Sequence, residues 1–329
     1  MENRETPKIA FFEVKEGEAP FVEQCNIPAE KIIIHDTVQD FLTQEEGRAQ
    51  AKNFEALSVM VHSHLSRDTL EQFPQLKLIV TRSVGYDHID LAYCKEKGIA
   101  VTHVPDYGSH VIAEHVFALL LSSVRKILEG EAETQQGIFN DEGLMGMALK
   151  GKTIGVIGTG KIGAHVCRIA SKGFLMKVIA YDVHPQPELA EQYDFQYVDN
   201  LDTLYRESDI ITLHVPLFES TRHMINRESI AKMKDGVTLI NTSRGGLIDT
   251  HDLVAAIRAG KFSHVALDVV EHEENIAEVQ ELLELPGVII TPHIAYYTRE
   301  SVGNMYSTSC EELRRFFAGE ALQYPVQGI

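Results

Sequence analysis

The stretch Lys152-Thr-Ile-Gly-Val-Ile-Gly-Thr-Gly-Lys-Ile-Gly163 decides the fold. Its apolar first half predicts a strand, and the apolar residues that recur at helical spacing after Lys161 predict a helix. Gly158, Gly160 and Gly163 mark the junction. Glycines at this spacing allow a tight turn, a close approach of the backbone to a phosphate and close packing of helix on strand. The junction therefore predicts a dinucleotide site, with the helix N-terminus facing the pyrophosphate.

A second apolar strand, 177–181, ends in Asp182. A carboxylate at this place accepts hydrogen bonds from the ribose hydroxyls and repels a 2′-phosphate, so NAD is favoured over NADP. A GxGxxG alone occurs often by chance, and a structural strand–helix unit with incidental glycines is the alternative reading. The second strand and its terminal acid favour the nucleotide site.

Size and charge limit the class of protein. A chain of 329 residues with 44% hydrophobic and 24% charged residues is ordinary globular material, long enough for two domains. The net charge of −18 argues against a nucleic-acid or anionic-membrane partner. An anionic substrate would need a local cationic pocket.

The sequence favours a cytoplasmic setting. The cysteines Cys25, Cys94, Cys167 and Cys310 are scattered and form no CxxC pair. No secretory signal opens the chain and no apolar run is long enough to span a bilayer, so a reducing cytoplasm is the simplest compartment.

Strands alternate with helices on both sides of the glycine loop, which predicts two mostly parallel sheets. The first third has no phosphate fingerprint and is expected to serve the other substrate. Between the two units, the helix expected at 110–128 is more apolar than one buried stripe requires, so we infer burial against a second surface such as a subunit partner. The expected strands are 8–14, 30–35, 57–62, 76–81, 99–103, 209–214, 237–241, 265–269 and 288–291; the expected helices include 43–54, 67–73, 227–234, 250–259 and 276–285.

Chemistry-bearing residues follow the expected strands of the second half. In open parallel sheets the ligand lies beyond the carboxyl ends of the strands. Arg244 follows 237–241, Asp268 with Glu271 and Glu273 follows the next strand, and His293 follows the last one. One cation, one histidine and several carboxylates thus share the rim beside the nucleotide, where hydride chemistry needs them.

Four ordered motifs carry a family resemblance: GTGKIG with the later YD, INTSRGGLID, ALDVVEHEE and TPHIAYYT. Together they resemble the NAD-dependent D-2-hydroxyacid dehydrogenase family, its D-lactate dehydrogenases most of all. The blocks 81–90, 104–108 and 112–115 fit as well, so the match covers nearly the whole chain. The resemblance implies two Rossmann-like domains with a cleft between them, usually in a homodimer, here through the 110–128 helix. The flavodoxin-like substrate domain would be split, 1–103 and 297–329, and the doubly wound NAD-binding domain would be 104–296.

The resemblance also implies a catalytic set. Arg244 would hold the substrate carboxylate and polarise the keto oxygen, which suits a planar guanidinium, and the two glycines after it would let a ligand approach. His293 would be the acid/base, and Glu273 would orient it and favour its imidazolium form. Glu271 and Glu274 are the competing carboxylates, and an ordinary surface ion pair is the alternative for Arg244.

Further roles follow from the resemblance. Val84 and Gly85 would offer backbone N–H groups to the substrate carboxylate, helped by Tyr107, which could equally be a packing aromatic. Tyr296 would line the side-chain pocket and favour a small or apolar group. Asp268 would accept a bond from the nicotinamide carboxamide, with a strand-end helix cap as the alternative. The other expected cofactor residues are Thr159, Lys161 and Ile162 at the phosphate turn, and His214, Val215, Pro216, Thr242 and Ser243 on the adenosine and ribose side.

No metal is expected. His62 and His64 resemble a metal pair but lack a third ligand, although one of them could face the substrate. The acidic run 271–278 is expected to be a charged helix start. Asp106 and His110, beside Tyr107, and the short segment 274–286 depart from many family members and weaken pyruvate as the specific substrate.

The predicted activity is reversible hydride transfer between NADH and a small 2-keto acid, with pyruvate to D-lactate placed first. Glyoxylate or hydroxypyruvate reduction is the nearest rival. An NAD(H)-sensing scaffold of the co-repressor kind ranks below both, because the full catalytic set is present.

Overall fold

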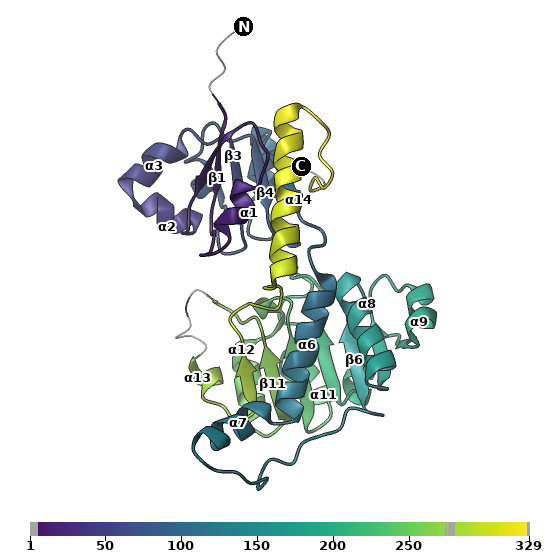
Figure 1. The fold of residues 1–329 in the computed structure, drawn as a ribbon. Coiled ribbons are helices and arrows are strands. Elements are labelled where there is room, and N and C mark those ends of the chain that lie inside the picture. The colour runs from purple at the N-terminus through teal and green to yellow at the C-terminus, as the bar shows by residue number, and fades with distance from the viewer. Residues whose placement is uncertain (1–5, 274, 276–279, 328–329) are drawn as a thin grey trace. The chain divides into compact units, whose positions relative to one another are not determined.

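The structure is a computed structural model, and it describes residues 6–273, 275 and 280–327. The chain forms two compact units, Met1–Gly108 with Tyr297–Ile329 and Ser109–Tyr296 (Figure 1). Each is an α/β unit built on a parallel sheet, so the predicted fold class is confirmed. The sequence placed the first junction after residue 103, whereas residues 104–108 belong to the first unit here.

The first unit has a five-stranded sheet in the order β2-β1-β3-β4-β5. Every neighbouring pair is parallel, and this order is that of flavodoxin-like folds. The central strands β3 and β4 are buried along their whole length, as expected when helices cover both faces. The strands are β1 (Lys8–Phe11), β2 (Glu30–Ile33), β3 (Ala56–Val59), β4 (Leu78–Thr81) and β5 (Ala100–His103).

In the described part of this unit six helices lie around the sheet, and the last of them, α14, follows the second unit in the sequence. Tyr306 and Leu313 of α14 are buried in the same core as Leu78 of β4. Near this core Cys25 and Cys310 pair as a disulfide, with Cα atoms 5.4 Å apart. The helices are α1 (Ala19–Glu23), α2 (Val38–Thr43), α3 (Glu45–Ala51), α4 (Arg67–Leu70), α5 (Leu91–Lys97) and α14 (Arg299–Ala318).

The single helix expected at 43–54 is wrong in its bounds, because two helices occupy 38–51. Gln44 has extended backbone angles, φ −84° and ψ 138°, which end α2 and start α3. Gly47 then packs so closely that an added Cβ would lie 2.0 Å from the carbonyl oxygen of Phe41. The break therefore folds the two short helices onto each other.

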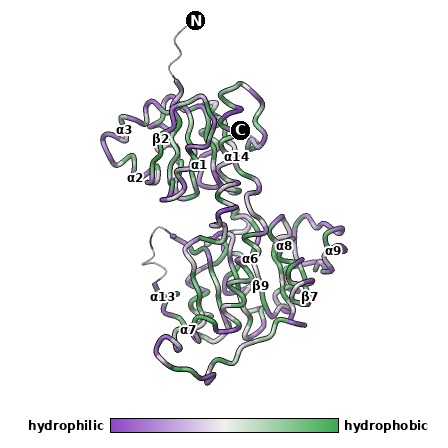
Figure 2. The backbone as a smooth tube through the Cα atoms, viewed as in Figure 1, coloured by the Kyte–Doolittle hydropathy of each residue, from purple (hydrophilic) through white to green (hydrophobic). Residues whose placement is uncertain are grey.

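The second unit has a seven-stranded parallel sheet in the order β12-β11-β10-β9-β6-β7-β8. The strand order reverses between β6 and β9, as in a doubly wound nucleotide-binding fold, and ligands bind at such switch points. Figure 2 shows the hydrophobic colour over inner strands such as β9 and the hydrophilic colour over helices such as α9. The strands are β6 (Thr153–Ile157), β7 (Lys177–Tyr181), β8 (Gln196–Tyr197), β9 (Ile210–Leu213), β10 (Val237–Asn241), β11 (Phe262–Leu267) and β12 (Val288–Ile290).

The first helix of this unit, α6 (Ser109–Val124), explains the broad apolar surface seen in the sequence. Val116 and Leu120 are fully buried in a core shared with Ile240 and Ala266 of the sheet. On the same helix Phe117 stacks on Phe174, with ring centroids 5.1 Å apart. The second surface against α6 therefore lies in its own unit, and its hydropathy requires no subunit partner.

The other helices of the second unit follow the strands in turn. The helix expected at 110–128 ends at Val124, since Lys126 takes a left-handed backbone (φ 51°) before α7 begins. The helix expected at 276–285 is described only as α13, and 276–279 lie outside the described residues. Among described helices, none is long and apolar enough to cross a membrane. The set is α7 (Ile127–Gln135), α8 (Lys161–Arg168) with a π-helical turn (Ile169–Gly173), α9 (Pro187–Tyr193), α10 (Leu201–Glu207), α11 (Arg227–Lys232), α12 (Thr250–Arg258) and α13 (Gln280–Leu283).

Candidate active site

The glycine loop joins β6 to α8, and its three glycines do different work. Gly158 has φ +93°, and a Cβ there would lie 2.7 Å from the carbonyl oxygen of His214. A Cβ on Gly163 would lie 1.9 Å from the carbonyl oxygen of Gly158, so helix and strand pack in direct backbone contact. Gly160 meets nothing within 4 Å. The loop thus turns tightly, packs tightly and leaves an open place at the start of α8, and a helix N-terminus is a favourable place for a phosphate.

Asp182 follows β7 and is tied to this loop. Its Oδ2 accepts hydrogen bonds from the backbone N–H of Thr159 at 2.6 Å and from the Thr159 hydroxyl at 3.0 Å. Partial burial would raise the pKa of Asp182, but the bonds from Thr159 and from the His184 N–H lower it below its ordinary value. The carboxylate is therefore charged at neutral pH. A charged acid beside the phosphate turn suits ribose hydroxyls and opposes a 2′-phosphate.

Two buried polar atoms lie just after β9 and β10, the strands next along the sheet from β6. Within the described part of the chain, Nδ1 of His214 and Oγ1 of Thr242 are buried and have no hydrogen-bond partner. Burial lowers the pKa of His214, so its ring is neutral, and its Nε2 bonds the Thr212 hydroxyl at 2.9 Å. Buried polar groups are nearly always satisfied. These two buried atoms without a protein partner, at the ends of β9 and β10, are therefore consistent with hydrogen bonds to a polar ligand such as a dinucleotide.

The remaining predicted cofactor residues lie around the same edge. Lys161 is exposed and Ile162 half-buried in the first turn of α8, and Val215 and Pro216 leave β9 beside Gly158. Ser243 donates its hydroxyl to the carbonyl of Leu213 at 2.7 Å and so connects the ends of β9 and β10. Its role in the structure is this connection; contact with a cofactor stays a prediction.

Arg244 stands in the turn after β10, held by Asn241. The Asn241 amide donates to the Arg244 carbonyl at 2.8 Å and accepts from the Ser243 N–H at 3.0 Å. The glycine after Arg244 was expected to admit a ligand. Instead a Cβ on Gly245 would lie 2.0 Å from the backbone of Val270. The glycine therefore lets the Arg244 turn pack against the segment that follows β11.

His293 and Glu273 meet directly. Nδ1 of His293 lies 2.8 Å from Oε2 of Glu273, with side chains 18% and 26% exposed. His293 follows β12 in a left-handed backbone, φ +53°, an uncommon conformation for a residue other than glycine. Such strain persists only where neighbours hold it, and it gathers at functional sites. The pair has the geometry of a histidine oriented by a carboxylate.

The competing carboxylate, Glu271, points elsewhere. Its Oε2 accepts from the N–H of Thr250 at 3.0 Å and from its hydroxyl at 2.6 Å, and its Oε1 lies 2.7 Å from Nε2 of His223. Burial would raise the pKa of Glu271, but the bonds from Thr250 and His223 lower it. Glu271 thus anchors the start of α12. Glu274, the other competitor, lies outside the described residues.

Asp268 is fully buried beneath the segment that carries His293. Its Oδ1 accepts from the Thr291 hydroxyl at 2.5 Å and the Ile294 N–H at 2.9 Å, and its Oδ2 from the Ala295 N–H at 2.8 Å. Burial would raise the pKa of Asp268, but these bonds and one from His115 lower it. The carboxylate is held by hydrogen bonds from the 291–295 segment. It caps no helix, and it is buried. Contact with a nicotinamide carboxamide stays a prediction.

The predicted substrate residues divide between the units. Tyr296 lies in the second, 9% exposed, with its ring edge-on to His293 at 6.3 Å between centroids. Val84 and Gly85 lie in the first, where their carbonyls accept bonds from His103 and Ser83. Tyr107 is also there, and its carbonyl accepts from the Asn304 amide at 3.2 Å.

The histidines His62 and His64 are exposed in the loop after β3, each held through its backbone. The N–H of His62 donates to Glu13 at 3.2 Å and that of His64 to Gln39 at 3.1 Å. That one of these rings faces the substrate stays a prediction.

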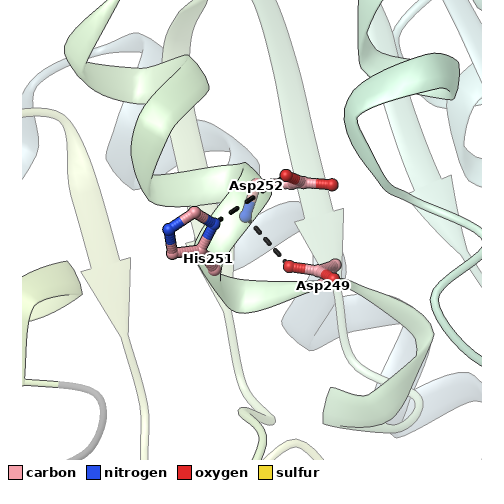
Figure 3. Close-up of side chains that lie close together, drawn as sticks. All are labelled: Asp249, His251 and Asp252. Atoms are coloured by element: carbon pink, nitrogen blue, oxygen red, sulfur yellow. Dashed lines mark hydrogen bonds and ion pairs between the residues drawn. The ribbon is translucent and has the colours of Figure 1, made fainter.

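Among the residues that the structure describes, one cluster has the composition of a metal site. Asp249, His251 and Asp252 lie together at the start of α12 (Figure 3). Asp249 caps this helix by accepting from the Asp252 N–H at 2.9 Å, Asp252 accepts from the Arg227 N–H at 2.8 Å, and the His251 side chain is 87% exposed. Both carboxylates are thus engaged in local structure, and we assign no ion to them.

Sequence reasoning missed the residues that hold this site in place. Asn241, Thr291 and Tyr197, whose hydroxyl lies 2.8 Å from that of Thr159, touch predicted site residues. Asn241 offered a signal, because an amide ends the predicted strand 237–241, three residues before Arg244. Thr291 and Tyr197 offered none, since only the fold brings them to their partners.

Known proteins resemble this chain in sequence and fold. The family described as "D-isomer specific 2-hydroxyacid dehydrogenase, NAD binding domain" matches residues 117–295. A "2-hydroxyacid dehydrogenase homolog 2" of Schizosaccharomyces pombe is 35% identical over 323 residues, 94% of this chain and 96% of that protein. A hydroxypyruvate reductase of Thermotoga maritima is 41% identical over 268 residues, 81% of this chain and 86% of that protein.

Solved structures agree with the sequence matches. The D-lactate dehydrogenase of Aquifex aeolicus, complexed with NAD and lactic acid, superposes with a TM-score of 0.86 at 40% identity. The match covers 95% of this chain and 96% of that one.

Proposed function

Because the chain belongs to the D-isomer specific 2-hydroxyacid dehydrogenase family, NAD-dependent oxidoreductases, we propose that it interconverts pyruvate and D-lactate. The observation that carries the proposal is the His293–Glu273 pair at 2.8 Å, in the unit that carries the dinucleotide loop. A histidine oriented by a carboxylate is what proton transfer to a keto oxygen requires.

The proton moves at His293. NADH, when bound, supplies the hydride that reaches the keto carbon. Nδ1 of His293 is directed to Glu273, so Nε2 is the nitrogen that gives its proton to the keto oxygen in reduction and takes it back in oxidation. Glu273 fixes the plane of the ring through its Oε2, 2.8 Å from Nδ1. Reduction therefore needs the protonated ring and oxidation the neutral one.

Arg244 supplies the cation that the substrate needs. The chain carries a net charge of −18, so a small carboxylate is repelled by the protein as a whole. A guanidinium offers two parallel N–H groups to the carboxylate and keeps its charge at every relevant pH. Asn241 holds the turn from which Arg244 projects, with its amide 2.8 Å from the Arg244 carbonyl. Val84, Gly85 and Tyr107 stay proposed as binding residues for a substrate carboxylate.

Tyr296 is proposed to limit the substrate's side chain. Its ring stands edge-on to His293 and is almost fully buried, which favours a small or apolar group on the carbon next to the keto group. The Aquifex aeolicus enzyme, solved with lactic acid, supports pyruvate as the substrate. The hydroxypyruvate reductase at 41% identity supports hydroxypyruvate as the second candidate.

A keto-acid panel tests the proposal. Pyruvate, hydroxypyruvate, glyoxylate and phenylpyruvate are each reduced with NADH and, separately, with NADPH. We expect pyruvate with NADH to give the highest kcat/KM. A higher value for hydroxypyruvate would move the assignment to the second candidate, and no turnover with any of the four would refute the activity.

We also propose that two copies associate, as the sequence suggested through the 110–128 helix. The buried face of α6 gives this no support, but the chain just beyond it exposes large apolar side chains. Ile127 and Leu128 are 52% and 51% exposed, and Phe139 and Met145 are 92% and 90% exposed. Light scattering of Phe139→Ser with Met145→Ser is expected to show a smaller species than the wild type. The cytoplasmic setting stays a prediction from the sequence.

A further inference from the structure

The segment 291–295 carries His293, and the fold constrains it from below. The N–H of His293 donates to the backbone carbonyl of Asp268 at 2.9 Å, and the Asp268 carboxylate accepts from Ile294 and Ala295. These bonds fix three successive N–H groups around a residue with φ +53°. The direction of the His293 ring therefore depends on where the Asp268 carboxylate stands.

A second histidine reaches the same carboxylate from another element. His115 lies on α6, and its Nε2 is 3.3 Å from the Thr291 hydroxyl oxygen and 3.5 Å from Oδ1 of Asp268. Its side chain is 19% exposed, whereas that of Asp268 is 0% exposed. His115 lies on a helix packed in the core, so its contact with the buried Asp268 carboxylate can hold that carboxylate in place.

The hydrogen positions follow from counting donors. The Thr291 hydroxyl has one proton, and the 2.5 Å bond to Asp268 uses it. Its oxygen can then only accept from His115, so Nε2 of His115 carries a hydrogen. The chain of bonds runs in one direction, from the His115 ring through the Thr291 hydroxyl to the Asp268 carboxylate.

We infer that His115 is a positioning residue for the acid/base His293, acting through Thr291 and Asp268. It touches neither substrate nor the reacting ring; it keeps the Asp268 carboxylate in register with the N–H groups of the 291–295 segment. The inference rests on the proposed function, since the orientation of the His293 ring affects the rate only if that ring transfers the proton.

Three variants separate positioning from folding. His115→Phe keeps an aromatic ring and removes the donor, whereas His115→Gln retains an N–H donor of similar reach. Glu114→Gln is the control on the same helix, because Glu114 is exposed. A misplacement of about 1 Å can cost on the order of 100-fold in rate. We expect kcat for keto-acid reduction to fall roughly 10- to 100-fold in His115→Phe, to recover largely in His115→Gln and to stay unchanged in Glu114→Gln.

Two readouts distinguish positioning from lost folding. The solvent deuterium isotope effect on kcat rises in His115→Phe, because the proton step becomes slower, while the NADH Kd stays within about twofold of the wild type. A second variant, Thr291→Val, removes the hydroxyl in between, and coupled residues give non-additive losses. The double variant is therefore expected to be no slower than the slower single one. Losses that multiply, or an unchanged isotope effect, would overturn the inference.

Hydrogen exchange tests the inference without turnover. The amides of Ile294 and Ala295 should exchange at least about 10-fold faster in His115→Phe than in the wild type, and at the wild-type rate in Glu114→Gln. Unchanged exchange would overturn the positioning role. If the wild type reduces no keto acid but the exchange rates respond as expected, the proposed function fails and the positioning of the segment stands.

Discussion

Replacing two glycines of the same loop by alanine should separate cofactor binding from stability. In Gly163→Ala the new Cβ would lie 1.9 Å from the carbonyl oxygen of Gly158, where about 3.5 Å is comfortable, so α8 must move away from β6. Overpacking of this kind costs about 1–3 kcal/mol. In Gly160→Ala nothing lies within 4 Å, and the backbone angles of φ −60° and ψ −168° suit alanine.

Gly163→Ala should therefore lose stability but not cofactor binding, and Gly160→Ala should lose cofactor binding but not stability. Gly163→Ala should melt roughly 2–12 °C below the wild type, given a shift of about 2–4 °C per kcal/mol for a unit of this size. Gly160→Ala should melt at or slightly above the wild type, because alanine restricts the unfolded chain. Its methyl group occupies the open place at the helix start, so its NADH Kd should rise at least about 10-fold, or about 1.4 kcal/mol.

Thermal unfolding with and without NADH measures both effects. At an NADH concentration of 100 times the wild-type Kd, the ligand stabilises the wild type by about 2.7 kcal/mol and Gly160→Ala by about 1.4 kcal/mol. Fluorescence titration gives the Kd directly. Wild-type NADH affinity in Gly160→Ala would refute the phosphate site, and wild-type stability in Gly163→Ala would refute the packing argument.

Three further predictions use single substitutions. Glu273→Gln should lower kcat about 10- to 100-fold at unchanged melting temperature, whereas Glu271→Gln should cost about 1–3 kcal/mol of stability, measured by urea unfolding. Because the pKa of Glu271 is lowered in the fold, its contribution is present above the carboxyl's unfolded pKa and is lost as pH falls through the folded value, so the wild type and Glu271→Gln should converge in stability at pH values below that folded pKa. Arg244→Lys should raise KM for the keto acid about 10-fold or more while the NADH Kd holds, and an unchanged KM would remove Arg244 from the carboxylate site. Asp182→Ser should raise kcat/KM with NADPH relative to NADH, because a carboxylate with a lowered pKa no longer repels the 2′-phosphate; an unchanged ratio would contradict the cofactor argument.

Much of this fold could be predicted because its determinants are local. The glycine loop and the strands around it can be predicted from the spacing of apolar residues and of glycines within a few positions. The position of Arg244, Asp268 and His293 after successive strands places them at one sheet edge before any coordinates are known. The strand 237–241 was predicted with the bounds that the structure has.

The rest depends on residues that are distant in the chain. Cys25 and Cys310 are 285 residues apart and pair only because α14 returns to the first sheet. His115 and Thr291 are separated by 176 positions. The many apolar residues of α6 correctly predicted that the helix is buried on more than one side, but they did not identify the surface that covers the second side.

The choice between two acids two positions apart also needed the structure. Spacing favoured Glu273 over Glu271 as the partner of His293, yet spacing cannot aim a side chain. In the fold, the bonds of Glu271 to Thr250 and His223 direct it to the start of α12, and Glu273 is the one that reaches Nδ1 of His293. Gly245, the first of the two glycines after Arg244, is required by close backbone packing on Val270, which the sequence could not distinguish from ligand access.

The most direct test of the account is the turnover of His293→Ala with NADH and the best keto acid of the panel, measured beside its NADH titration. A positioned general acid contributes about 100- to 10,000-fold to rate. We predict that kcat falls by at least about 100-fold while the NADH Kd and the melting temperature stay at wild-type values. Wild-type turnover in His293→Ala would contradict the assignment of the proton to this ring and, with it, the mechanism.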